Sequence, residues 1–254
     1  MHLTRKYMNN RKSRIALITG GNSGIGFATA KVLKDLGDTV IITGRRKAAV
    51  EKAAAELGVI PFLADQSKVA DIEQLVAAVK REFGQLDILF INAGIVGRST
   101  IEATPESLFD DVMDINFKGA FFTLSRFIPI LADGASVVFL SSIVSVMAIE
   151  GSSIYCASKA ALNALMKTAA LELAARKIRV NAVSPGLTET EVLNKAGYTE
   201  QELDGIKKYL VDRLPLKRIG HSRDVGQLVA YLCSDASDFI TGSEFVIDGG
   251  MLLR

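Results

Sequence analysis

The sequence contains few of the residues that build metal sites or disulfide frameworks. Its 254 residues include no tryptophan, two histidines (His2 and His221) and two cysteines (Cys156 and Cys233). Two cysteines are too few for a disulfide framework, and none of these side chains stands at a spacing typical of metal ligands. We therefore expect no metal site and a reducing, cytoplasmic compartment.

Long hydrophobic runs are also missing. The most apolar stretch, residues 115–131, is interrupted by Asn116, Lys118, Ser125, Arg126 and Pro129, whereas a membrane-spanning helix needs about 18 uninterrupted apolar residues. The N-terminus lacks the apolar segment of a secretory signal. The sequence thus predicts no membrane partner.

Excess charge of one sign is absent from the chain as a whole. Lys and Arg total 30 and Asp and Glu total 28, a formal net charge of +2, whereas a nucleic-acid-binding domain is usually more basic. Removing the five bases of the first 14 residues leaves 25 bases against 28 acids. Those bases are Arg5, Lys6, Arg11, Lys12 and Arg14. We expect residues 1–14 to form a loose basic tail before one domain at 15–254.

Short apolar runs alternate with longer helical patterns along that domain. The predicted strands are Ile15–Thr19, Thr39–Thr43, Val59–Leu63, Leu86–Ile91, Ser136–Leu140, Ile178–Val183 and Glu244–Ile247. The clearest helical patterns are Gly24–Leu36, Arg46–Leu57, Val69–Phe83 and Ile154–Arg176. Near-continuous apolar strands are typical of strands buried on both faces. The pattern predicts an α/β fold: a single doubly wound, Rossmann-like domain with a parallel sheet of about seven strands and helices on both faces.

A glycine-rich turn joins the first strand to the first helix. It reads Thr19-Gly20-Gly21-Asn22-Ser23-Gly24-Ile25-Gly26, the pattern T-G-x-x-x-G-x-G. Glycines at such a junction permit a tight turn and a close approach of the backbone to a phosphate, and the helix N-terminus offers unpaired N–H groups to a pyrophosphate. The position of this turn favours nucleotide binding over a purely conformational role.

The end of the second strand bears on which dinucleotide is bound. The residue that reads the ribose is expected about 20 positions after the glycines, where this chain has Gly44, Arg45 and Arg46. An acid there would bind a ribose 2′-hydroxyl, whereas guanidiniums pair with a 2′-phosphate. The sequence therefore favours NADP(H) over NAD(H), although two solvated arginines at a helix start would look the same.

A candidate catalytic group follows in the second half of the chain. Tyr155 and Lys159 are four residues apart on a predicted helix and so share a face. A phenol is a poor acid or base at neutral pH, but a neighbouring ammonium lowers its pKa. Ser142 is placed to hold a carbonyl or alcohol oxygen beside the Tyr155 hydroxyl. A Tyr/Lys pair alone is also common on helix surfaces.

Both segments together resemble one family, the short-chain dehydrogenases/reductases, from Ile15 to about Met251. Further matching segments occur in the family's order: Asn92-Ala93-Gly94, Asn116, Ser142 before Tyr155, Asn181-Ala182-Val183-Ser184-Pro185-Gly186, Ile240-Thr241-Gly242 and Val246-Ile247-Asp248-Gly249-Gly250.

The resemblance implies an NAD(P)-dependent oxidoreductase that interconverts a ketone and a secondary alcohol. Tyr155 would be the general acid/base, and Lys159 would lower the pKa of Tyr155 and hold the nicotinamide ribose. Ser142 would orient the substrate oxygen. Asn116 would kink its helix and support a water-linked proton relay through Lys159.

The resemblance also implies a set of cofactor contacts beyond Arg45, Arg46, Tyr155 and Lys159. Asp65 occupies the adenine-contacting place, and Thr190 fits the hydroxyl that contacts the carboxamide, with Thr188 as the competing choice. The full set adds Gly20, Asn22, Ser23, Gly24, Ile25, Gly26, Gln66, Asn92, Ala93, Gly94, Pro185 and Gly186.

Three residues depart from or stand outside the family pattern. Ser23 replaces the basic residue that NADP-preferring members often have before the middle glycine, which weakens the preference for NADP without reversing it. Cys156 is turned about 100° from Tyr155 on a helix, so we expect it to pack rather than react. His221 has no acid/base partner in the pattern and is interpreted as structural or solvated.

The segment from about Glu189 to Leu216 is expected to cover the substrate site. Its mixture of apolar and charged residues suits a moderately apolar pocket for a small carbonyl or alcohol, whether a sugar, a steroid, an acyl thioester or a small ketone. By resemblance the chain forms a homotetramer or a homodimer. Two alternatives remain: a non-catalytic dinucleotide-binding sensor or scaffold, and a methyltransferase, which would need an acid at Gly44 and has no use for Tyr155 and Lys159.

Overall fold

The computed structural model describes residues 13–189, 205 and 211–253. One parallel sheet has the strand order β3-β2-β1-β4-β5-β6-β9, and β7 and β8 form a separate two-stranded pair. The strands are β1 (Ile15–Ile18), β2 (Thr39–Gly44), β3 (Ile60–Leu63), β4 (Leu86–Ile91), β5 (Leu131–Leu140), β6 (Arg179–Pro185), β7 (Thr188–Glu189), β8 (Gly220–His221) and β9 (Glu244–Ile247). The predicted seven-stranded doubly wound fold is confirmed.

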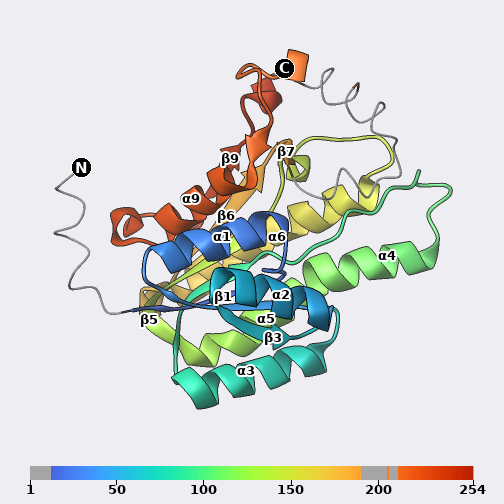
Figure 1. Cartoon of the computed structure of the whole chain (residues 1–254). Helices are drawn as coiled ribbons and strands as arrows, with labels where there is room; N and C mark the ends of the chain where they lie inside the picture. Colours follow the sequence, from blue (N-terminus) through green and yellow to red (C-terminus); the bar gives the residue numbers. More distant parts are fainter. Residues whose placement is uncertain (1–12, 190–204, 206–210, 254) are drawn as a thin grey trace.

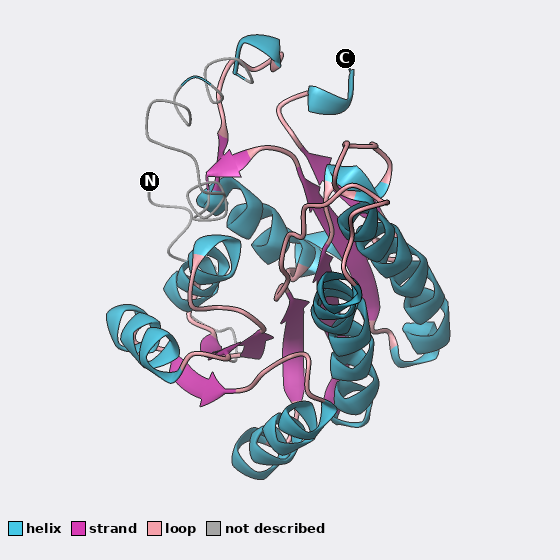
Figure 2. Cartoon of the chain, turned by 90° about the vertical axis from the view of Figure 1, so that its right-hand side faces the viewer, coloured by secondary structure: helices cyan, strands magenta, loops and turns pink. Residues whose placement is uncertain are grey.

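Helices cover both faces of this sheet (Figures 1 and 2). The helices include α1 (Gly24–Asp35), α2 (Lys47–Leu57), α3 (Val69–Phe83), α4 (Glu106–Met113), α5 (Gly119–Phe127), α6 (Ser153–Leu173) and α9 (Ser222–Leu232). Apolar residues of α1, α2 and α9 join one buried cluster, and those of α3, α5 and α6 join the other. The sheet is therefore buried on both faces, which explains why its strands read as continuous apolar runs.

The ends of the predicted elements differ little from the observed ones. The largest difference is at β5, which begins at Leu131 rather than Ser136 because its first residues pair with β4 across a shift in register between Leu86 and Ile88. The short pair β7–β8 has no distinct pattern in the sequence. None of the helices in the described ranges has both the length and the apolar character needed to cross a membrane.

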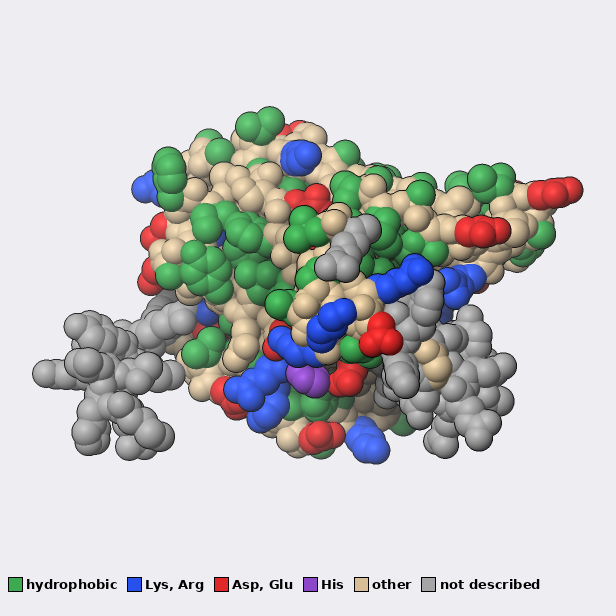
Figure 3. All heavy atoms as spheres, turned by 90° about the horizontal axis from the view of Figure 1, so that it is seen from above, with side chains coloured by type: hydrophobic (Ala, Val, Ile, Leu, Met, Phe, Trp, Pro, Cys, Tyr) green, Lys and Arg blue, Asp and Glu red, His purple; other side chains and the backbone are tan. Residues whose placement is uncertain are grey.

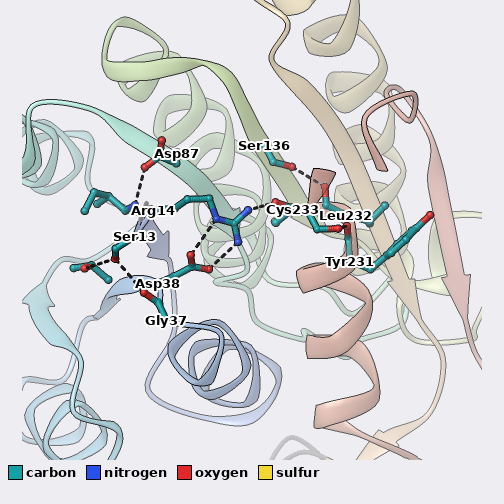
Figure 4. Close-up of polar contacts among 12 residues, drawn as sticks. Ser13, Arg14, Gly37, Asp38, Asp87, Ser136, Tyr231, Leu232 and Cys233 are labelled. Carbon is teal, nitrogen blue, oxygen red and sulfur yellow. Dashed lines mark hydrogen bonds and ion pairs between the residues drawn. The ribbon is translucent and has the colours of Figure 1, made fainter. Parts of the chain in front are cut away.

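The last residues of the predicted tail contact the domain at the end of the sheet where the strands begin (Figure 4). The guanidinium of Arg14 binds the carboxylate of Asp38 through two nitrogens, at 3.0 and 2.8 Å, and also donates to the carbonyl of Cys233. The Asp38 side chain is 2% exposed. Burial raises the pKa of Asp38, against the opposing effect of Arg14. Arg14 thus compensates a buried charge, while residues 1–12 lie outside the described part of the chain.

Candidate active site

The candidate site lies at the carboxyl ends of the central strands. The chain order of the sheet reverses between β1 and β4, and a crevice at such a reversal is where doubly wound sheets bind ligands. The glycine-rich turn follows β1, Asn92-Ala93-Gly94 follows β4, and Ser142 follows β5. The fold therefore brings the predicted glycine turn and the predicted catalytic segment to one edge.

The glycine-rich turn needs glycine for two distinct reasons. Gly20 and Gly24 have positive φ angles of 65° and 54°, which residues with a Cβ rarely adopt. Gly26 needs space instead, because a Cβ there would lie 2.5 Å from Nδ2 of Asn92 and 2.6 Å from the carbonyl oxygen of Gly20. The start of α1 therefore packs directly against its own turn and the end of β4.

Asn92 and Thr19 fasten β4 to this turn. The side-chain amide of Asn92 donates to the carbonyls of Thr19, at 2.8 Å, and Gly20, at 3.1 Å. The hydroxyl of Thr19 accepts the backbone N–H groups of Asn92 and Ala93, each at 3.0 Å. These bonds fix the end of β4 to the turn that follows β1.

At the end of β2, the space that an acid would need is filled. A Cβ on Gly44 would lie 2.5 Å from Oδ1 of Asn22 and 2.8 Å from Cγ2 of Val50. The next two side chains, Arg45 and Arg46, are exposed, and neither has an ion-pair partner within the described ranges. The end of β2 thus carries two exposed guanidiniums and no carboxylate of its own.

The catalytic candidates Ser142, Tyr155 and Lys159 come together between the end of β5 and α6. Ser142 caps a single 3-10 turn, Ile143–Ser145, that packs on α6, and its side chain lies near enough to Tyr155 to lower the pKa of that phenol. The Nζ of Lys159 lies 5.7 Å from the centre of the Tyr155 ring and donates to the carbonyl of Leu140 at 2.7 Å.

The pKa of Tyr155 departs from expectation. Burial raises it, and the nearby Ser142 only partly opposes that rise. Lys159 is not among the groups that shift it; the Nζ of Lys159 donates to the Leu140 carbonyl, and burial lowers the pKa of Lys159 itself to about 8. In this structure the pKa of Tyr155 is thus raised and not lowered as expected.

Asn116 lies in a π-helical turn, Asp114–Lys118, between α4 and α5. This agrees with the expectation that it kinks its helix. Its side chain accepts from the N–H of Ile95 at 2.8 Å and donates to the carbonyl of Ile95 at 2.9 Å and to the hydroxyl of Ser158 at 3.1 Å. Asn116 thereby holds the segment after Gly94 against α6, close to the catalytic candidates.

The remaining predicted contacts follow β3 and β6, at the same edge of the sheet. A carboxylate oxygen of Asp65 accepts from the N–H and hydroxyl of Ser67, and the neighbouring Gln66 is buried. After β6, a Cβ on Gly186 would lie 2.6 Å from the Cβ of Asp248, so this loop packs closely on the chain after β9. Thr188 donates to the carbonyl of Gly186 at 3.2 Å, whereas Thr190 lies outside the described residues.

His221 and Cys156 keep the minor roles expected of them. His221 is exposed, precedes α9, and contacts a carboxylate oxygen of Glu189 at 3.0 Å. Basic and acidic side chains gather around a histidine on the face of the molecule shown in Figure 3. The thiol of Cys156 points to the carbonyl of Met147. Among the described residues no cluster of His, Cys, Asp and Glu could hold a metal ion.

Known proteins match this chain over almost its whole length. A family model described as enoyl-(acyl carrier protein) reductase matches residues 20–252. The 3-oxoacyl-[acyl-carrier-protein] reductase FabG of Staphylococcus epidermidis is 34% identical over 250 residues, which are 95% of this chain and 100% of the relative. FabG of Thermotoga maritima is 33% identical over 249 residues, which are 95% and 99%. The crystal structure of levodione reductase superposes with a TM-score of 0.90 at 30% identity, covering 96% of this chain and 100% of that one.

The chain is a short-chain dehydrogenase/reductase. As a member of this family it is an NAD(P)-dependent oxidoreductase. The site fits a nicotinamide dinucleotide, because Gly20, Gly24 and Gly26 let the backbone at the start of α1 approach a pyrophosphate.

Proposed function

We propose that the protein interconverts a ketone and a secondary alcohol with NADP(H), with Tyr155 as the general acid/base. The observation that supports this proposal is that Ser142 and the buried Lys159 both lie beside Tyr155, at the edge where the glycine-rich turn lies. A bound nicotinamide would supply or accept the hydride. The names of the FabG relatives favour a 3-oxoacyl thioester as the substrate.

The chain's own residues divide the remaining work. Ser142 and Tyr155 hold the substrate oxygen between their hydroxyls, and a neutral Tyr155 gives its proton to that oxygen during reduction. Because burial raises the pKa of Tyr155, the phenol stays protonated at neutral pH and is ready to donate. Positive charge brought near the ring by the dinucleotide and Lys159 would stabilise the phenolate that the proton leaves behind.

Preference for NADP(H) rests on the corner after β2. A 2′-phosphate carries negative charge that Arg45 and Arg46 can pair with, and the packing of Asn22 and Val50 against Gly44 leaves no space for an acid that would repel it. Exchanging Arg45 for Asp should weaken NADPH binding much more than NADH binding in fluorescence titrations. Equal losses for both dinucleotides would refute the phosphate pairing.

The general acid/base is tested by Tyr155→Phe. We expect this variant to bind NADPH like the wild type and to lose turnover by roughly two to four orders of magnitude, the usual contribution of a positioned proton donor. Oxidation of NADPH or NADH is followed by absorbance against acetoacetyl thioesters and a panel of ketones. A largely active variant refutes the role of Tyr155, whereas a wild type that binds dinucleotide but never turns over indicates a sensor or scaffold instead.

We further infer that the protein is a homotetramer. Exposed apolar side chains on α5 and α6 (Phe121, 42%, and Leu171, 81%) and near β9 (Phe239, fully exposed, and Val246, 47%) support two separate contact faces. Light scattering after size exclusion should give four chains per particle. A monomer refutes the assembly.

A further inference from the structure

Gln66 is a buried residue in the turn after β3, and its side-chain amide lies between two segments of the site. The Nε2 atom donates to the carbonyl of Ile115 at 3.2 Å and, less closely, to the carbonyl of Ala93 at 3.4 Å. The residue is 8% exposed. One amide nitrogen therefore joins the chain after β4 to the turn before α5.

Each of these two carbonyls belongs to a segment with a place in the site. Ala93 packs on the glycine-rich turn, since a Cβ on Gly20 would lie 3.0 Å from its Cα. Ile115 precedes Asn116 in the π-helical turn. At the end of that turn the N–H of Gly119 donates to the carbonyl of Asp114. It therefore does not make the ordinary α-helical hydrogen bond to the carbonyl of Ile115.

The packing around Gln66 leaves its side chain little freedom. A Cβ on Gly119 would lie 2.2 Å from the carbonyl oxygen of Gln66 and 2.7 Å from its Cγ, so the first turn of α5 rests directly on this residue. Its Oε1 is buried and has no partner in the described part of the chain. A buried acceptor without a partner costs stability. This cost indicates that the amide contributes through the hydrogen bonds that its Nε2 atom donates.

We propose that Gln66 is a positioning residue for the reaction. Its amide ties the Ala93 segment, which lines the dinucleotide crevice, to the turn that carries Asn116, so that dinucleotide binding and the placement of Asn116 are coupled. The role goes beyond direct contact with the dinucleotide, because the side chain is turned into the protein. This inference rests on the proposed function of the site.

Two substitutions and one control separate positioning from packing. Gln66→Met keeps the length of the side chain and removes the donor. Gln66→Glu keeps the shape and, when ionised, sets a carboxylate against two carbonyl oxygens, but its protonated form regains one donor. Thr123→Val is the control, because Thr123 belongs to α5 and is also buried, with a side-chain oxygen that has no partner among the described residues.

The first readout is NADPH and NADH binding, measured by fluorescence titration with folding checked by circular dichroism. We expect Gln66→Met to bind about tenfold more weakly, the effect of losing one or two hydrogen bonds, and Thr123→Val to bind like the wild type. Gln66→Glu should bind more weakly still at pH 8 and recover at pH 6, because burial raises the pKa of a carboxyl. A packing defect would not produce such a recovery of affinity at pH 6, and the wild type should not show it. If Gln66→Met does not fold, the pH dependence of Gln66→Glu is sufficient to test the proposal.

The second readout is a double-mutant cycle on turnover with Gln66→Met and Asn116→Ala. Coupling predicts that the combined loss is smaller than the product of the two single losses. If the losses of turnover multiply, or if Gln66→Met binds dinucleotide like the wild type, the role of Gln66 is refuted and the proposed function is not affected. A wild type that binds neither dinucleotide refutes the proposed function instead.

Discussion

We expect the buried Lys159 to lower the free energy of unfolding of the protein. Its side chain is buried, and the pKa is lowered from 10.5 to about 8. At about 1.4 kcal/mol per pH unit, the protonated form costs about 3 kcal/mol of folding free energy at pH 7. Lys159→Met removes that cost but leaves the carbonyl of Leu140 without its donor, a loss of about 1 kcal/mol. The variant should therefore be about 2 kcal/mol more stable than the wild type at pH 7, and inactive.

The stability difference between Lys159→Met and the wild type should depend on pH. Above pH 8 the folded protein releases the Lys159 proton while the unfolded chain keeps it up to about pH 10.5, so wild-type stability rises with pH in that interval. The advantage of Lys159→Met should shrink from about 2 kcal/mol at pH 7 to near zero at pH 9.5. Urea unfolding without dinucleotide measures it at pH 7, 8.5 and 9.5.

A matched control is available on the same helix. Lys167 lies on α6 with its side chain exposed, so Lys167→Met should change stability by less than about 0.5 kcal/mol at every pH. Two results would refute the reasoning: a Lys159→Met variant no more stable than the wild type at pH 7, or a gain that stays constant up to pH 9.5.

Two further substitutions probe the packing that supports the site. Arg14→Met leaves the buried carboxylate of Asp38 without its partner and should cost about 3–5 kcal/mol at pH 7. Because the pKa of Asp38 is already raised and would rise further, the loss should be smallest near pH 4 and grow as the pH rises; a loss independent of pH in denaturant unfolding would contradict this. Gly26→Ala forces a Cβ against Asn92 and the carbonyl of Gly20 and should cost about 1–3 kcal/mol of stability together with most NADPH affinity in titrations. Wild-type affinity would show that the turn does not approach the pyrophosphate.

The sequence predicted the central strands of the sheet well because they are buried on both faces, as the burial of β1, β4 and β6 shows. The run Leu86–Ile91 has a single polar position, Asp87, and its observed bounds are the predicted ones. The grouping of Ser142, Tyr155 and Lys159 also followed from the sequence, because the carboxyl ends of parallel strands meet at one edge.

Several properties of the site depend on distances that a sequence does not contain. The direction of the Tyr155 pKa shift was wrong because a spacing of four residues places Lys159 on the same helix face but does not say where its Nζ donates. The contact of Asn22 over Gly44 joins the turn after β1 to the end of β2. The amide of Gln66 bonds to carbonyls 27 and 49 residues away, and no local signal marks that role.

The strand order also determines which parts of the site are synthesised first. The crevice for the dinucleotide is framed by β1, β2 and β4, which are complete at Ile91, whereas Tyr155 follows about 60 residues later. At roughly 5–20 residues per second, the ribosome delivers the phosphate-binding half several seconds before the catalytic helix. Each later strand of the sheet, β5, β6 and then β9, is added to the edge left by the one before. In a nascent chain, the strands that frame the dinucleotide site are thus complete before Tyr155 has been synthesised.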